Sequence, residues 1–178
     1  MSSLRSTTFC FCLLTICCTP PAIAQSAPNA KLPACAASEY RQFDFWQGDW
    51  DVRDASGKIV GRNRIVSLQG GCALQENWSG AGGVSGTSLN IYDNDRKRWH
   101  QTWVDNSGGL LQLDGGMVGG AMVLRGESIA ADASSKPTLQ RITWTPQSDG
   151  RVRQLWESSS DSGKTWSVVF DGIYSKRP

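Results

Sequence analysis

The sequence predicts an all-β protein, an antiparallel up-and-down β-barrel of about ten short strands, with a β-sandwich as the alternative. Three observations support this fold class. The 178-residue chain contains 19 Gly, which indicates many tight turns. Short runs of alternating apolar and polar residues follow one another at nearly even spacing from Trp50 onward. No stretch has the periodicity of a long helix.

Residues 1–24 have the pattern of a secretory signal peptide. Arg5 supplies the positive start, residues 9–18 the apolar centre, and a small-residue cleavage site ends at Ala24. The apolar centre is too short to span a bilayer, which takes about 20 residues. A lipoprotein signal ending at Cys17 is a weaker alternative. We therefore expect a secreted or periplasmic chain with no membrane-inserted segment after cleavage.

Two cysteines remain after such a cleavage, because four of the six lie in the signal segment. Cys35 and Cys72 are an even pair in an oxidising compartment, so the economical interpretation is a disulfide. Two buried free thiols are the alternative. Residues 25–38 are rich in Ala, Ser and Pro and indicate a flexible N-terminal arm, which the bridge would tie to the body of the protein.

Residues 39–178 are expected to form a single barrel domain, since the amino-acid composition does not change along this stretch in a way that would indicate a second domain. Residues 39–47 suit one helical turn before the first strand. Turn signals rich in Gly, Asn, Asp and Ser separate the later runs. The expected strands are 50–54, 58–68, 72–79, 86–93, 98–105, 110–115, 121–127, 138–145, 152–158 and 165–175.

Composition excludes several classes of function. A net charge of +2 is too small for a nucleic-acid binder. The sequence has one His and no cluster of residues at metal-ligand spacing. It also lacks a phosphate-binding loop, a dinucleotide fingerprint and a Ser in a nucleophile-elbow motif. We therefore expect no cofactor, no metal and no nucleic-acid partner.

Alternation along the strands predicts which side chains face inward. The pairs Gln101 with Trp103 and Gln154 with Trp156 are the clearest, each on one face of a strand. The last strand is expected to turn Trp166, Val168, Phe170 and Tyr174 to one face. The strands over 58–68 and 138–145 are ambiguous.

These faces suggest a ligand cavity, because aromatic rings and single polar groups suit a partly apolar molecule. The equal alternative has Trp filling the barrel and Gln facing solvent. The predicted ligand-binding residues are Glu76, Trp78, Trp99, Gln101, Trp103, Gln154, Trp156 and Phe170. The expected function is non-catalytic binding of a small hydrophobic molecule. The alternatives are an enzyme acting on a lipid- or isoprenoid-like substrate in the same cavity, and a filled structural barrel.

Glu76 is the one acid expected inside the barrel, between inward-facing Leu74 and Trp78. A buried carboxylate must find a partner or take up a proton. Arg62 and Arg64 lie on a neighbouring expected strand. We expect a structural ion pair between one of them and Glu76, with an acid–base or ligand-orienting role as the alternative.

Residues 159–166 match the Asp-box pattern S-x-D-x-G-x-T-W. A single copy predicts a stabilised hairpin turn without sugar chemistry: Asp161 accepts hydrogen bonds from the backbone and Gly163 takes the strained turn.

Four stretches carry a resemblance to a known family: residues 43–52, 70–78, 98–105 and 170–174. Together they resemble the DUF1579 type of small secreted bacterial proteins of unknown function. The resemblance covers about residues 39–176 and implies a lipocalin-like barrel, but it implies no activity. Gly48 and Trp50 match the G-x-W signature of lipocalins and related calycins, which implies that Trp50 closes one end of the barrel.

The strand number also resembles fatty-acid-binding proteins and nitrobindin-like haem barrels. The second resemblance implies a His as axial ligand of haem, and His100 is the only candidate. Alternation places His100 opposite Trp99 and Gln101, on the outer face. Haem binding through His100 therefore stays an alternative that would need a shifted strand register.

Overall fold

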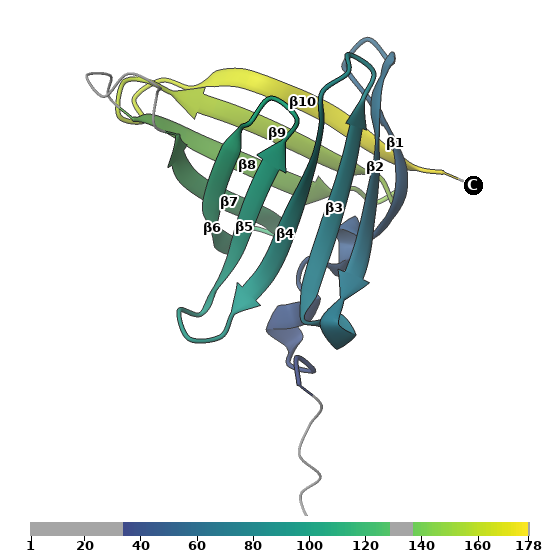
Figure 1. Cartoon of the computed structure of the whole chain (residues 1–178), viewed down its shortest axis with the longest axis vertical. Coiled ribbons are helices and arrows are strands. Elements are labelled where there is room, and N and C mark those ends of the chain that lie inside the picture. The colour runs from purple at the N-terminus through teal and green to yellow at the C-terminus, as the bar shows by residue number, and fades with distance from the viewer. Residues whose placement is uncertain (1–33, 129–136, 178) are drawn as a thin grey trace, which may run out of the picture. The chain divides into compact units, whose positions relative to one another are not determined.

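A computed structural model describes residues 34–128 and 137–177, and ten antiparallel strands account for most of them (Figure 1). The strands are β1 (Gly48–Arg53), β2 (Ile59–Leu68), β3 (Ala73–Gly80), β4 (Ser85–Asp93), β5 (Arg98–Asp105), β6 (Leu110–Val118), β7 (Ala121–Ser128), β8 (Thr138–Pro146), β9 (Val152–Ser159) and β10 (Ser167–Lys176). Each overlaps one of the ten strands that the sequence predicts.

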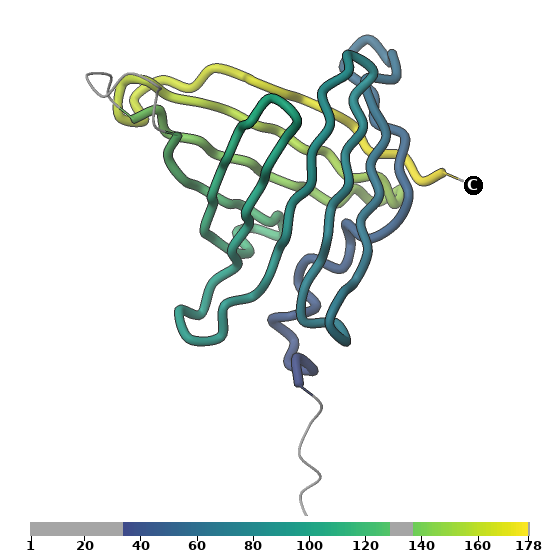
Figure 2. The backbone as a smooth tube through the Cα atoms, in the orientation of Figure 1, coloured from purple at the N-terminus to yellow at the C-terminus, as the bar shows by residue number. Residues whose placement is uncertain are grey.

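The strands form a closed up-and-down barrel, which confirms the predicted fold class. Each strand pairs with the next along the chain, and β1 pairs with β10 to close the ring. The course of the chain from strand to strand can be followed in Figure 2. The closing ladder sets Trp50 opposite Lys176 and Val52 opposite Tyr174. The sandwich alternative is therefore wrong, and the described strands leave no open sheet edge.

Two short 3₁₀ helices precede the barrel, η1 (Ser38–Arg41) and η2 (Asp44–Trp46), where the sequence predicts one helical turn. They lie at one end of the barrel (Figure 1). Phe43 and Trp46 are fully buried and stack with ring centroids 4.8 Å apart. Phe43 also meets the edge of Trp144 at 5.2 Å. We call Phe43 and Trp46 the aromatic plug.

Trp50 lies beside the aromatic plug and is fully buried. Its Nε1 donates to the carbonyl oxygen of Trp46 at 2.9 Å, and the ammonium group of Lys176 sits 4.0 Å from the centre of its ring. Gly48 has φ of 133°, and any side chain there would collide with Lys176. This end of the barrel is therefore held by hydrogen bonding and cation–π contact as well as by apolar packing.

The predicted disulfide between Cys35 and Cys72 is confirmed, and it ties the segment before η1 to the connection between β2 and β3. That connection contains a third 3₁₀ turn, η3 (Gln69–Gly71). The predicted signal segment, 1–24, and most of the predicted arm, 25–38, lie outside the described residues. Within the described residues, no helix is long and apolar enough to cross a membrane.

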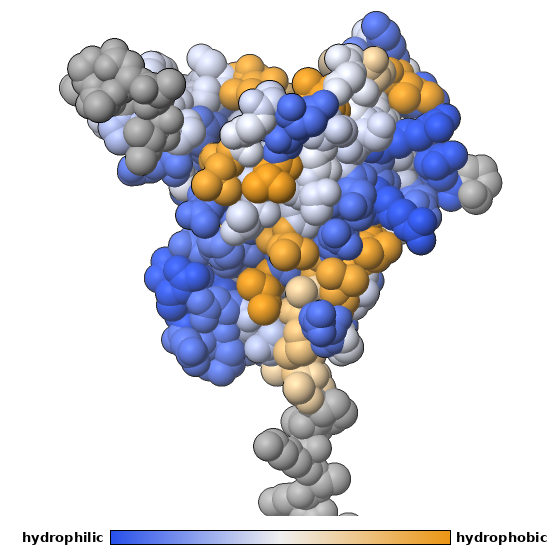
Figure 3. All heavy atoms as spheres, in the orientation of Figure 1, coloured by the Kyte–Doolittle hydropathy of each residue, from blue (hydrophilic) through white to orange (hydrophobic). Residues whose placement is uncertain are grey.

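The two ambiguous strands follow the same alternation as the others. Strand β2 turns Gly61, Asn63 and Ile65 inward, and β8 turns Gln140, Ile142 and Trp144 inward. On the outer face of the barrel, larger apolar side chains such as Leu89 and Val104 are exposed. On the face that Figure 3 shows, small apolar areas lie among polar ones.

The expected inner face of the last strand is wrong for half of its residues. A β-bulge in β10 leaves Val168 opposite Glu157 and Phe170 opposite Trp156, with Val169 as the extra residue. Beyond the bulge the alternation is reversed, so Val168 points outward. Trp166 also lies outside, where the guanidinium group of Arg141 stands 4.1 Å from its ring centre.

The Asp-box turn joins β9 to β10 and has the expected hydrogen bonds. Asp161 Oδ1 accepts from the Thr165 backbone N–H at 2.9 Å, and Asp161 Oδ2 accepts from the Thr165 hydroxyl at 2.6 Å. Gly163 has φ of 85°, and its carbonyl oxygen accepts from Trp166 Nε1 at 3.2 Å. The motif is a stabilised hairpin turn.

Candidate functional site: a cavity inside the barrel

A cavity of about 240 Å³ lies inside the barrel, between the aromatic plug and the opposite end. Its lining falls into three groups: the aromatic residues Trp78, Trp103, Trp144, Trp156, Phe170 and Tyr174, the aliphatic residues Val84, Leu111, Ile142 and Val169, and the polar residues Glu76, Gln101, Asp105 and Gln154. Val84 is 51% exposed and Val169 is 49% exposed, so the lining reaches the surface at the end away from the plug.

The structure brings seven of the eight predicted ligand-binding residues together around this cavity. They are Glu76, Trp78, Gln101, Trp103, Gln154, Trp156 and Phe170. Trp99 also faces inward, but it is buried against the aromatic plug, with its ring 5.6 Å from Phe43. Its Nε1 donates to Gln42 Oε1 at 3.1 Å. Trp99 therefore belongs to the floor of the barrel and not to the cavity lining.

Glycines on neighbouring strands make room for two of the indole rings. A side chain at Gly61 of β2 would overlap the ring of Trp78, and one at Gly86 of β4 would overlap the ring of Trp103. Trp78 also meets the edge of Phe170, with centroids 6.0 Å apart. Because the rings lie against the inner wall, the barrel can contain many bulky side chains and still be hollow.

Hydrogen bonds to side chains fix the indoles of Trp103 and Trp156. Trp103 Nε1 donates to Asp105 Oδ2 at 3.2 Å, and Trp156 Nε1 donates to Gln140 Oε1 at 2.7 Å. Asp105 also accepts from the hydroxyl and backbone N–H of Ser107 and the backbone N–H of Gly109. These donors lower the pKa of Asp105 to about 2, the largest effect coming from the Ser107 hydroxyl.

Glu76 lies deeper in the cavity and is only 5% exposed. One carboxyl oxygen accepts from Asn63 Nδ2 at 2.6 Å, and the other accepts from Ser88 Oγ at 2.7 Å. Burial raises the pKa of Glu76 above its ordinary value, while these two hydrogen bonds oppose the rise. The carboxyl group is thus held by neutral donors.

The expected ion pair between Glu76 and an arginine of β2 is wrong. Asn63 points inward, so its neighbours Arg62 and Arg64 point outward. Arg62 pairs with Asp51 at 3.5 Å and Arg64 pairs with Asp49 at 3.7 Å, both on the outer face.

A continuous row of buried polar side chains extends from Glu76 across the inner wall. On one side, Ser88 accepts from Asn90 Nδ2 at 2.9 Å, and Asn90 Oδ1 accepts from Gln101 Nε2 at 2.7 Å. On the other side, Asn63 Nδ2 is 3.3 Å from the hydroxyl oxygen of Tyr174. We call this row the polar belt.

The Tyr174 hydroxyl extends the polar belt by donating to Gln154 Oε1. Burial raises the pKa of Tyr174 well above its ordinary value, and the nearby carboxyl of Glu76 raises it further. Tyr174 therefore remains a protonated donor at neutral pH. Gln154 turns its one oxygen toward Tyr174, which leaves its amide nitrogen as the end that can donate to a ligand.

Sequence reasoning missed Asn63, Ser88, Asn90 and Trp144. The local pattern pointed the wrong way for Asn90, because it alternates with apolar Leu89 and Ile91, which by themselves favour the inner face. The structure exposes Leu89 and Ile91 and turns Asn90 inward. Trp144 is 1% exposed, and its Nε1 has no hydrogen-bond partner among the described residues. It packs against the aromatic plug, and part of its side chain lines the cavity.

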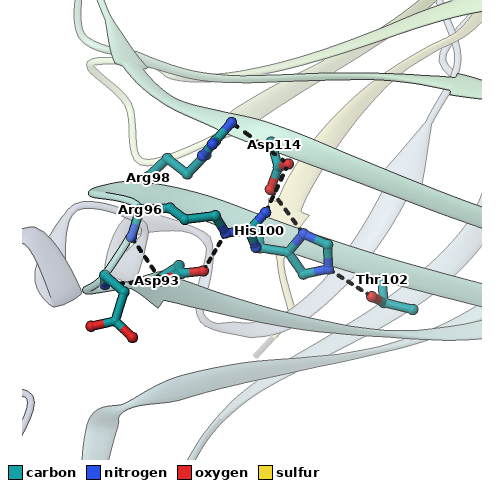
Figure 4. A network of polar contacts seen from close by, with 7 residues as sticks. Asp93, Arg96, Arg98, His100, Thr102 and Asp114 are labelled. Atoms are coloured by element: carbon teal, nitrogen blue, oxygen red, sulfur yellow. Dashed lines mark hydrogen bonds and ion pairs between the residues drawn. The ribbon is translucent and has the colours of Figure 1, made fainter.

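His100 lies on the outer face of β5, as alternation predicts (Figure 4). Its Nδ1 is 2.9 Å from Asp114 Oδ1, and its Nε2 is 2.9 Å from Thr102 Oγ1. Arg96 and Arg98 also reach Asp114. Both ring nitrogens of His100 are engaged and point away from the cavity. A haem inside the barrel would not fit this residue as its axial ligand.

No family model matches the chain, and no curated protein matches it significantly.

Proposed function

We propose that the protein is a non-catalytic binding barrel that holds a small, largely apolar ligand in its cavity. The observation that carries this proposal is the lining itself: aromatic rings surround the space, and a few polar groups converge on it. This is the composition of ligand sites, in which apolar surface supplies affinity and single polar groups supply orientation.

The volume of the cavity limits the size of the ligand. Its volume of about 240 Å³ lies below the usual 300–1,000 Å³ of sites for drug-sized molecules. With about 30 Å³ for each water in the liquid, the space equals roughly eight waters. We expect a ligand of about eight to twelve non-hydrogen atoms, much smaller than haem or a long-chain fatty acid.

Binding without chemistry agrees with the state of the polar groups. Both oxygens of Glu76 accept hydrogen bonds from side chains of the barrel, and the Tyr174 hydroxyl donates to Gln154. These groups are therefore held in fixed places by other side chains of the barrel. An enzyme acting on an isoprenoid-like substrate would need one of them to exchange a proton during turnover.

We further propose that the mature protein is secreted or periplasmic, starts at Gln25 after signal-peptide cleavage, and belongs with the DUF1579-type proteins that it resembles. The disulfide supports an oxidising compartment. Intact-mass measurement of the exported protein tests the start and the bridge together. A chain that starts at Cys17 or Cys18 with added lipid would contradict the proposed cleavage before Gln25.

The ligand proposal is tested first by native mass spectrometry of freshly purified protein, which should show a co-purified small molecule. Ligand entry should also change the tryptophan emission. Trp156→Ala should weaken binding at least several-fold, because large aromatic contact area is lost. Trp166→Ala, on the outer wall, is the matched control. A broad panel of small apolar compounds that leaves emission and melting temperature unchanged would overturn the proposal.

A further inference from the structure

The cavity has acidic groups and no basic ones. Among the described lining residues, the ionisable side chains are Glu76, Asp105 and Tyr174, and none is Lys, Arg or His. Arg62 and Arg64, the nearest arginines in sequence to the inward-facing Asn63, are turned to the outer face and paired there. The interior of the barrel therefore offers a ligand negative charge without a compensating cation.

Aromatic faces surround these acids. Six of the lining residues are aromatic, and Trp78 and Phe170 meet at nearly right angles, with an interplanar angle of 80°. The faces of aromatic rings carry negative charge density, which attracts cations when water is excluded. Rings at different angles around one space resemble the cages that bind ammonium groups.

The two carboxyl groups stand at different depths. Asp105 is near the exposed end, fixed by Trp103, Ser107 and Gly109, and it is ionised at neutral pH because its pKa is about 2. Glu76 lies farther in, between Asn63 and Ser88. A charged ligand thus meets a permanent negative charge first and a buried carboxyl second.

We propose that the cavity selects a small organic cation, an ammonium group on a short apolar body, with Glu76 as its counter-ion. This inference rests on the proposed binding function and names the class of its ligand. The apolar body lies among the indole rings, and the ammonium group donates to Glu76. A ligand with a carboxylate head is rejected, because the ionised Asp105 repels it and no cation in the described lining pairs with it.

Whether ligand binding releases a proton depends on the protonation state of Glu76. Where Glu76 is protonated in the free protein, binding an ammonium ion ionises it and releases one proton to the solvent. Where Glu76 is already ionised, no proton is released. Tyr174, the other titratable group that faces Glu76, keeps its proton in both cases.

A matched trio of ligands tests the inference: 2-phenylethylamine, 2-phenylethanol and phenylacetate have the same ring and differ in charge. Calorimetric titration of the disulfide-bonded protein at pH 7 should show the amine binding about ten-fold or more tightly than the alcohol. The carboxylate should bind more weakly than the alcohol. Equal affinities for amine and alcohol, or tightest binding of phenylacetate, would overturn the inference and leave the proposed function standing.

Variants locate the effect. Glu76→Gln should lower the affinity for the amine about ten-fold and leave that for the alcohol within two-fold. Glu127→Gln, an exposed carboxylate on the outer face of β7, is the matched control and should change neither. If Glu76→Gln weakens amine and alcohol equally, Glu76 has only a structural role and the inference fails.

A second variant does not depend on the buried carboxyl. Asp105→Asn should reduce amine binding by a smaller factor, and this reduction should shrink at high salt because the site is near the surface. Titration in two buffers with different ionisation enthalpies measures the released proton. If none of the three ligands binds but a different, uncharged compound does, the inference of a cationic ligand fails and the proposed binding function stands. If no compound of the wider panel binds, the inference and the proposed function both fail.

Discussion

The indole of Trp103 on β5 occupies the space that a side chain at Gly86 on β4 would fill. The ring is further held by the hydrogen bond from its Nε1 to Asp105. Glycine within a strand lowers intrinsic strand stability, and Gly86, the second residue of β4, is compensated by a contact. The contact is the ring itself, which covers the exposed backbone and leaves the centre of the barrel open.

The substitution Gly86→Ala should push the Trp103 ring into the cavity. We expect weaker ligand binding and a loss of about 1–3 kcal/mol in the free energy of unfolding. Gly116→Ala is the control, because a methyl group at Gly116 of β6 meets nothing within 4 Å. Urea unfolding and fluorescence titration measure the two effects. Unchanged binding to Gly86→Ala would mean that the ring is not packed as described.

Gln154→Leu should destabilise the protein, because it removes the acceptor of the buried Tyr174 hydroxyl. An unsatisfied buried hydroxyl costs about 1–3 kcal/mol. Gln112→Leu makes the same change on the outer face of β6 and should stay within about 0.5 kcal/mol of the natural protein. Equal stability of the two variants would place Gln154 outside the polar belt.

Glu76 should make stability depend on pH. Its pKa is raised on folding, so its contribution to stability is fully present below the ordinary value of 4.5 and is lost as the pH rises through the folded pKa. Glu76→Gln cannot ionise. The free energy of unfolding of the natural protein should therefore fall, relative to Glu76→Gln, as the pH is raised from 4 to 8.

Urea unfolding at several pH values measures this difference. Surface carboxylates with a lowered pKa, such as Asp93 and Asp161, act in the opposite direction and lose their contribution only as the pH falls toward about 2. They are shared by both proteins and cancel in the comparison. A difference that stays constant across the range would show that the Glu76 carboxyl does not change its charge there.

Local pattern was enough to predict the strands and half of the residues that line the cavity. Period-two alternation is imposed by the strand itself, so Gln101 and Trp103 had to share a face whatever their neighbours. The bulge at Val169 was not predictable in this way, because an extra residue in one strand depends on its fit to β9. That one residue reversed the expected side of Trp166 and Val168.

Predicting the hydrogen-bond partners of Glu76 required knowledge of which face of β2 points inward. Charged Arg62 and Arg64 attract attention in the sequence, but the residue between them, Asn63, is the one that reaches the carboxyl. The exposed pair is itself the signal, since two arginines two residues apart favour the outer face. The aromatic plug depended on tertiary packing, because nothing local indicates that Phe43 and Trp46 fold back into the barrel end.

Removing the disulfide should cost stability without changing the cavity. The bridge closes a loop with a sequence separation of 37, for which the expected stabilisation is about 3–4 kcal/mol. Replacing both Cys35 and Cys72 by Ser should lower the free energy of unfolding by that amount and leave ligand affinity within two-fold, since neither cysteine lines the cavity. A large loss of affinity would link the plug end to binding.

The ladder between β1 and β10 has a consequence for how the protein folds. Trp50 lies near the start of the barrel domain in the sequence and Lys176 near its end, so the ring cannot close until the last strand is available. Contacts of such long sequence separation slow folding, and the free edge of β1 stays unpaired until β10 pairs with it. An exported chain would therefore complete its barrel only after its C-terminus had crossed the membrane, and any shortening of β10 should yield aggregation before it yields a weaker binder.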